Sequence, residues 1–133
     1  MVIITPVYGA ILALVFVALT IGVIGQRRAA KVSLGDGGNP RLLRRQRAHA
    51  NFAEYVPIAL ILMLCVELQQ TQPWLLNLIG LCLVVGRIAH AYAVSREPEP
   101  MRLRVIGMTL TIAALMTGAL GNLVLAITRL AAH

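Results

Sequence analysis

The stretch VIITPVYGAILALVFVALTIGVIG, residues Val2–Gly25, decides the fold of this chain because it contains no charged side chain. A helix that crosses the hydrocarbon core of a bilayer needs about 20 mainly apolar residues. The run is too long for the apolar core of a signal peptide, and no basic residue precedes it. We therefore expect a transmembrane helix that is retained in the mature protein.

The composition of the whole chain agrees with this first segment. Of its 133 residues 59% are hydrophobic and 13% are charged, and the mean hydropathy is +0.81. Soluble domains carry about 45–50% apolar and about 25% charged residues, so soluble, disordered and disulfide-stapled classes are excluded. The net charge of +7 comes with only 5% aromatic residues. The basic residues lie between apolar runs, which argues for membrane topology and an anionic ligand rather than nucleic acid.

Three further apolar runs follow the first one. Together they predict an all-α, integral membrane four-helix bundle that forms a single domain over residues 1–133. The four helices are expected over about residues 2–25, 41–68, 73–94 and 104–128. Asn39 and Pro40 are typical of a helix start, so the second helix should begin before the membrane.

The distribution of basic residues predicts the orientation of the bundle. They gather in the segments 26–46 and 95–104, whereas the connection over residues 67–72 has no Lys or Arg. The positive-inside rule places the two basic loops in the cytoplasm and both termini on the other side of the membrane.

Four polar residues lie inside the expected spans, where ionisable groups are costly unless they are paired or hydrated. Glu54 and Arg87 each lie roughly 20 Å from the non-cytoplasmic end of their helix, and Asn51 and His90 lie slightly nearer the cytoplasmic side. Arg47, Asn51 and Glu54 share one helical stripe, as Arg87 and His90 do. This spacing predicts a pocket for a hydrophilic, partly anionic molecule that is open to the cytoplasm. The alternatives are a structural Glu54–Arg87 ion pair and a packed histidine.

The sequence carries no motif for chemistry of its own. It contains no CxxC, no Cys/His cluster for a metal, no P-loop and no Ser-His-Asp set. Cys65 and Cys82 differ in expected depth by roughly 7 Å, which disfavours a disulfide. If a reaction occurs, we expect its nucleophile to arrive with the ligand.

The stretch RAHANFAEYVP, residues Arg47–Pro57, resembles the RAxxNxxEYxP signature of MAPEG proteins, the membrane-associated proteins in eicosanoid and glutathione metabolism. The resemblance extends to Gly25–Ala29, Gly86–His90 and Arg104–Met108, and it covers essentially the whole chain. It is to a bacterial-type member, which implies a bacterial inner membrane protein.

The resemblance implies a homotrimer that binds glutathione as a cosubstrate at subunit boundaries near the cytoplasmic side. Arg104, or alternatively Arg102, would stabilise the glutathione thiolate. The residues implied to bind glutathione are Arg28, Arg47, Asn51, Glu54, Tyr55, Arg87 and His90. The implied function is a detoxifying glutathione transferase or peroxidase that acts on lipophilic electrophiles or lipid hydroperoxides, with no metal.

Two other functions stay open at this point. Val94 and Met108 stand where glutathione-using relatives commonly carry tyrosines, which leaves a non-catalytic trimer that binds lipid or regulates a partner. A small four-helix transporter of cationic drugs would need an intramembrane carboxylate such as Glu54. The expected proximity of Arg87 disfavours the transporter, because the guanidinium would neutralise the carboxylate and repel cations.

Overall fold

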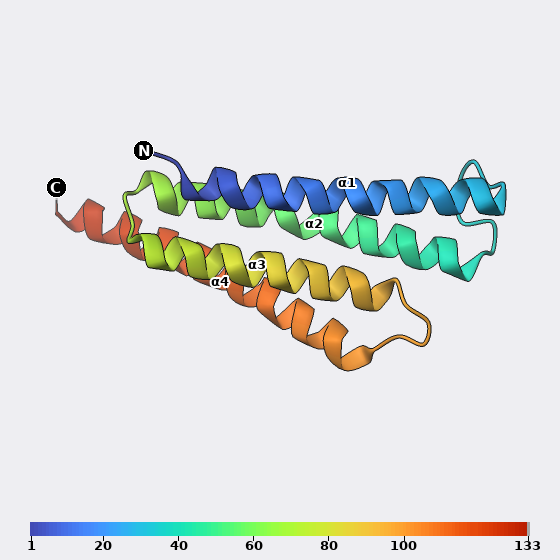
Figure 1. Ribbon diagram of the computed structural model, residues 1–133. Helices are drawn as coiled ribbons and strands as arrows, with labels where there is room; N and C mark the ends of the chain where they lie inside the picture. The colour runs from blue at the N-terminus through green and yellow to red at the C-terminus, as the bar shows by residue number, and fades with distance from the viewer. Residues whose placement is uncertain (133) are drawn as a thin grey trace.

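The computed structural model describes residues 1–132 and consists of four long helices (Figure 1). They are α1 (Ile4–Ala30), α2 (Pro40–Leu68), α3 (Pro73–Val94) and α4 (Met101–Ala131). Each is long and apolar enough to cross a membrane, so the predicted all-α, four-helix membrane bundle is confirmed. Both termini and the α2–α3 connection lie at one end, called here the terminal end. The other two connections lie at the opposite, loop end.

Two helices are longer than their apolar runs predict. α1 continues past Gly25 to Ala30 and ends where Lys31 adopts a left-handed conformation with φ of 55°. α4 begins at Met101, directly after Pro100, rather than at Arg104. Hydropathy falls at a charged residue, but arginine is a good helix former. The backbone helix therefore continues through residues at which the apolar run has already stopped.

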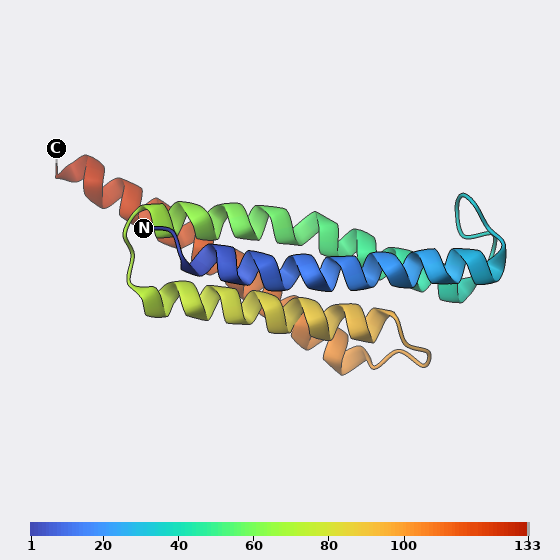
Figure 2. The ribbon, with the colours of Figure 1, turned by 45° about the horizontal axis from the view of Figure 1, so that its top comes forward.

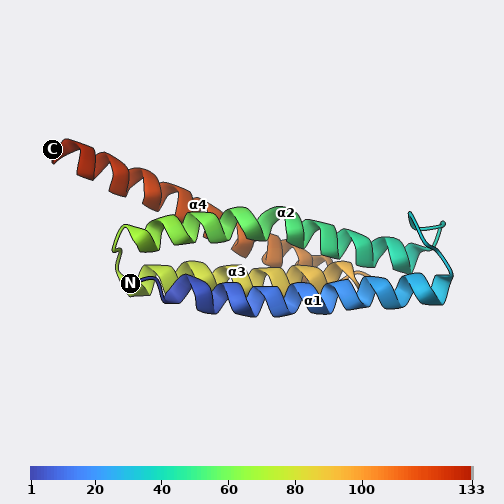
Figure 3. The ribbon, with the colours of Figure 1, turned by 90° about the horizontal axis from the view of Figure 1, so that it is seen from above.

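The helices α2 and α3 form the centre of the bundle. Among the described residues, α1 contacts α2 and α3 but not α4, while α4 contacts α2 and α3. The views in Figures 2 and 3 place α1 and α4 on opposite sides of this central pair. The core contains Leu12, Phe52, Met63, Ile79 and Leu83, all of them buried.

Small residues let α4 approach its neighbours closely. A Cβ atom added at Gly107 would lie 2.6 Å from the backbone nitrogen of His90, and one added at Gly86 would lie 2.8 Å from the Gly107 carbonyl oxygen. Further along α4, a Cβ at Gly118 would lie 3.2 Å from the Cβ of Leu62 on α2. Glycine at these positions therefore allows α3 and α4 to touch backbone to backbone, which fixes the position of His90.

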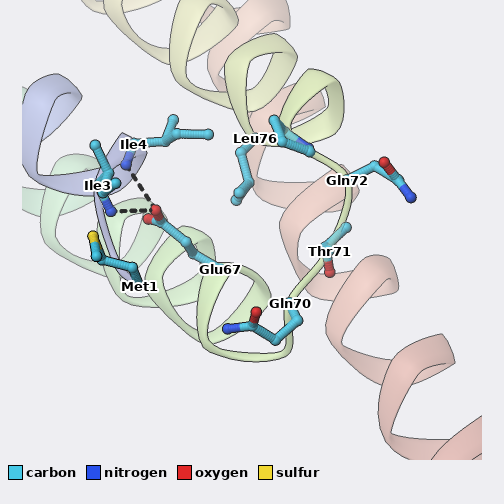
Figure 4. A pocket seen from close by; sticks show the side chains of 9 residues that line it. Met1, Ile3, Ile4, Glu67, Gln70, Thr71, Gln72 and Leu76 are labelled. Carbon is cyan, nitrogen blue, oxygen red and sulfur yellow. Dashed lines mark hydrogen bonds between the residues drawn. The ribbon is translucent and has the colours of Figure 1, made fainter.

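At the terminal end, a buried carboxylate caps α1 from another helix. The first turn of α1 contains no acidic residue and has no side-chain cap of its own. Glu67 of α2, which is 5% exposed, accepts hydrogen bonds from the backbone N–H groups of Ile3 at 2.6 Å and Ile4 at 2.7 Å (Figure 4). It also accepts one from the N–H of Thr5 at 2.7 Å. These are donors that a helix N-terminus otherwise leaves unsatisfied. Sequence reasoning missed this contact.

Candidate functional site

The charged side chain of Arg87 is buried inside the bundle. It belongs to α3 and is 1% exposed. Its Nη1 donates a long hydrogen bond of 3.5 Å to the backbone carbonyl of Asn51, and its guanidinium lies over the ring of Tyr55, 5.4 Å from the centroid. Among residues 1–132 no carboxylate lies within 4.0 Å of it. A buried charge without an ionic partner is costly. Packing alone therefore does not explain why an arginine occupies this position.

One nitrogen of this guanidinium and two further buried polar atoms lack a hydrogen-bond partner. They are Nε of Arg87, Oδ1 of Asn51 and Nδ1 of His90. His90 lies one turn after Arg87 on α3, is 5% exposed, and packs against the backbone of Gly107. Buried polar atoms in folded proteins are normally paired. We call Asn51, Tyr55, Arg87 and His90 the polar layer; it contains both donor and acceptor atoms without a partner.

The expected meeting of Glu54 with Arg87 does not occur. Glu54 is exposed on the surface of α2 and forms no ion pair within the described part of the chain, so the alternative of a structural ion pair is wrong. The reason is helical geometry at about 100° per residue. Asn51 and Tyr55 differ by about 40° and face α3, whereas Glu54 is turned about 60° away from Asn51.

The remaining predicted binding residues lie on the surface of the single chain. Arg47 is exposed on the same side of α2 as Glu54, and Arg28 is exposed near the end of α1. Arg102 is also exposed, at the start of α4. The structure therefore brings together Asn51, Tyr55, Arg87 and His90 and leaves the other predicted binding residues outside this layer.

Arg104 is held beside the polar layer by a carboxylate. Glu99, in the connection between α3 and α4, forms an ion pair of 2.9 Å with Arg104 and one of 3.0 Å with Arg44 of α2. Its side chain is only 16% exposed. Burial raises the pKa of Glu99, but the hydrogen bonds from Arg44 and Arg104 outweigh it and the pKa is lowered. We call this arrangement the Glu99 clasp.

The Glu99 clasp links the loop end to the polar layer, because His90 lies within electrostatic range of Arg87, Arg104 and Glu99. Sequence reasoning did not find it. The available signal was the placement of Glu99 between Pro98 and Pro100 in a segment with three arginines, since flanking prolines restrict the backbone of such a loop.

An apolar groove lies between α1 and α2, with a volume of about 310 Å³. Its lining includes Phe16, Phe52, Val56, Pro57 and Leu60, and it is almost free of polar surface. Phe52 and Val56 are direct neighbours in sequence of the polar-layer residues Asn51 and Tyr55. The same two turns of α2 therefore face a polar layer on one side and an apolar groove on another.

Comparison with known proteins agrees with this architecture. The MAPEG family profile matches residues 5–124. The Inner membrane protein YecN of Escherichia coli strain K12 is 33% identical over 120 residues, which cover 90% of this chain and 90% of YecN. The YecN protein of Escherichia coli O6:H1 strain CFT073 matches to the same extent. The family match contains every predicted site residue. With its four membrane-spanning helices, this chain belongs to the MAPEG family.

Proposed function

We propose that the protein binds glutathione in the polar layer and activates its thiol for attack on lipophilic electrophiles or lipid hydroperoxides. One observation carries the proposal: Arg87 is buried without a carboxylate, and its own Nε, Oδ1 of Asn51 and Nδ1 of His90 have no hydrogen-bond partner. An anionic peptide has carboxylates for the guanidinium and amide groups for Asn51 and His90. It would therefore satisfy groups that the protein alone leaves unpaired.

Arg104 is the residue that would stabilise the thiolate. The pKa of a free thiol is about 8.5, so a small fraction is ionised at neutral pH, and a fixed guanidinium next to the sulfur raises that fraction. Arg104 contacts Glu99, which lies in electrostatic range of His90. Both arginines are exposed, but only Arg104 forms an ion pair within the described residues, which supports Arg104 over its rival.

A homotrimer would complete the site. Glu54 and Arg47 are exposed along one side of α2, and Arg28 is exposed near the end of α1. A carboxylate that faces lipid is costly, so a neighbouring subunit or the ligand is the favoured environment for Glu54. In this arrangement Glu54 binds the α-amino group of glutathione, while Arg28 and Arg47 bind its carboxylates at the boundary between subunits.

The direct test is an ultraviolet difference spectrum of the thiolate that forms when glutathione is added to the purified protein. We expect a thiolate signal for the native protein and for Arg102→Ala, and loss of the signal for Arg104→Ala. Conjugation of glutathione to a chloronitrobenzene substrate should likewise be retained in the native protein and in Arg102→Ala and be lost in Arg104→Ala. No thiolate signal, together with no glutathione binding by calorimetry, would refute the proposal.

The relatives support the proposed membrane location, and the distribution of charges supports the proposed orientation. We place the protein in a bacterial inner membrane, since its relatives are named as inner membrane proteins, with the loop end in the cytoplasm. Ten of the twelve Lys and Arg residues lie at or near the loop end. A reporter enzyme that is active only outside the cytoplasm should be active when it is fused after α4 and inactive when it is inserted into the segment 31–39.

A non-catalytic, lipid-binding or regulatory trimer is the second candidate, and two observations favour it. Glu99 neutralises Arg104, and Val94 and Met108 provide no hydroxyl group near the polar layer. This candidate predicts that added glutathione produces no thiolate signal, whereas a signal that is lost in Arg104→Ala contradicts it.

A further inference from the structure

A polar cavity opens at the loop end, and the proposed function does not use it. Its volume is about 440 Å³. It is lined by the end of α1, the first turns of α2 and the residues that follow α3, namely Gln26, Arg41, Arg44, Arg45, Ser95, Arg96 and Glu97. None of these seven residues belongs to the polar layer or to the predicted glutathione ligands. We call it the arginine cavity.

The charges of the arginine cavity are unbalanced. Four guanidinium groups line it against the single carboxylate of Glu97, and of the four only Arg44 has a carboxylate partner, Glu99, within the described residues. Arg41, Arg44 and Arg45 are spaced i, i+3 and i+4 on one helix, where like charges repel one another. They also lie near the N-terminus of α2, whose first turn has no acidic residue and whose dipole favours anions.

Topology alone does not account for this arrangement. The positive-inside rule asks for basic residues on the cytoplasmic side of a span, but it does not require four of them to line one cavity. A local conflict between neighbouring charges is expected at a functional site, where a ligand removes it. The ligand that removes this one is an anion.

Two of the arginines are positioned by contacts of their own. The guanidinium of Arg45 lies against α1 at Gly22, where an added Cβ would come within 2.8 Å of its Nη1. The guanidinium of Arg96 lies over the ring of Tyr92, 4.7 Å from its centroid. Fixed guanidinium forks match the oxygens of a phosphate in pairs, and Ser95 adds a hydroxyl donor. We propose that the arginine cavity binds a phosphate group, carried by a lipid headgroup or by a soluble phosphate.

The experiment has two arms that separate the sources of the phosphate. In one arm, the protein in neutral detergent is titrated with inorganic phosphate and followed by phosphorus NMR. In the other, it is reconstituted in nanodiscs of phosphatidylcholine with or without phosphatidylglycerol, and retained lipid is counted by native mass spectrometry. Retention of phosphatidylglycerol without binding of inorganic phosphate assigns the site to a lipid headgroup. Broadening of the phosphorus NMR signal of inorganic phosphate assigns it to a soluble ligand. A negative result in both arms overturns the proposal.

Matched variants test whether the arginine cavity is responsible. The double variant Arg41→Gln/Arg45→Gln should weaken binding by about tenfold or more. The variant Arg41→Lys/Arg45→Lys, which keeps the charge but loses the forks, should fall between it and the native protein. It also carries the test if the Gln variant does not fold, as judged by circular dichroism. Lys31→Gln/Arg129→Gln removes two charges outside the cavity and should bind normally. Binding that survives in the Arg41/Arg45 Gln variant, or is lost equally in the control, overturns the proposal.

Discussion

Among the described residues, each half of the bundle buries one charged side chain, and the two differ in how well they are hydrogen-bonded. Glu67, near the terminal end, accepts three hydrogen bonds of 2.6–2.7 Å from backbone N–H groups of α1. Arg87, nearer the loop end, makes one hydrogen bond of 3.5 Å and keeps its Nε unpaired. A satisfied buried charge stabilises the fold, whereas an unsatisfied one lacks partners that a ligand could supply. The comparison thus separates a satisfied buried charge from an unsatisfied one, and in the proposed function the unsatisfied one binds the ligand.

The largest effect should come from Arg87→Met, which replaces the unpaired charge by an apolar side chain of similar length. We expect glutathione affinity to fall by about 100-fold or more, because the ligand loses its buried cation. The melting temperature should stay the same or rise, since no ion pair is broken. Calorimetry and circular dichroism measure the two quantities. A clear drop in melting temperature would show that Arg87 is structural after all.

Glu67→Ala should do the opposite. Removing this carboxylate leaves three amide donors of α1 without an acceptor, and we expect the free energy of unfolding to fall by about 2–3 kcal/mol. Glu67→Gln keeps one acceptor oxygen and should lose about half as much. Unfolding in mixed detergent micelles, followed by circular dichroism, measures this. The distinction between the two buried charges fails if either variant weakens glutathione binding while its stability is unchanged.

A smaller effect is expected from Glu99→Gln, which opens the Glu99 clasp. Arg104 then carries its full charge toward the polar layer. The fraction of bound glutathione present as thiolate at neutral pH should rise severalfold, which corresponds to about 1 kcal/mol for an ion pair of this exposure. The thiolate difference spectrum as a function of pH measures it, and Glu97→Gln, two residues away in the same loop, serves as the control. An unchanged titration would mean that Glu99 does not compete for Arg104.

The smallest effect concerns the pH dependence of stability. The pKa of Glu99 is lowered below its ordinary value of 4.5, so the Glu99 clasp contributes stability above that value. The contribution is lost as the pH falls through the lowered pKa of the folded state. The difference in melting temperature between the native protein and Glu99→Gln should therefore shrink as the buffer is made more acidic than 4.5. A difference that stays constant with pH would contradict the role of the clasp.

The sequence was sufficient for the fold because the signal lies in whole segments. Runs such as Val2–Gly25 satisfy the length and composition of a span independently of what packs around them. The helix ends were less accessible. Arg27 and Arg28 continue α1, and Arg102 and Arg104 lie within α4, although each charged residue lowers the local hydropathy. Cap geometry rather than hydropathy decides where these helices end.

The candidate site was only partly predictable, for a reason that lies in helix rotation. The depths of Asn51 and Arg87 follow from counting residues, and the two residues do meet. The direction in which Glu54 points cannot be predicted in this way. Apolar residues of α2 lie on every face of the helix, so the sequence does not define the rotation of α2 to within about 60°. Glu67 was inaccessible for another reason. Its partners are backbone amides, which every residue except proline has.

The cap at the terminal end has a consequence for the order in which the protein is made. The acceptor for the amides of Ile3, Ile4 and Thr5 lies 62–64 residues further along the chain. During synthesis all residues of α1 are therefore made well before Glu67, the acceptor of these hydrogen bonds, is made. It can be fixed in its final register only after α2 has emerged as far as Glu67 and returned to the same side of the membrane. The second span thus supplies the last hydrogen bonds of the first.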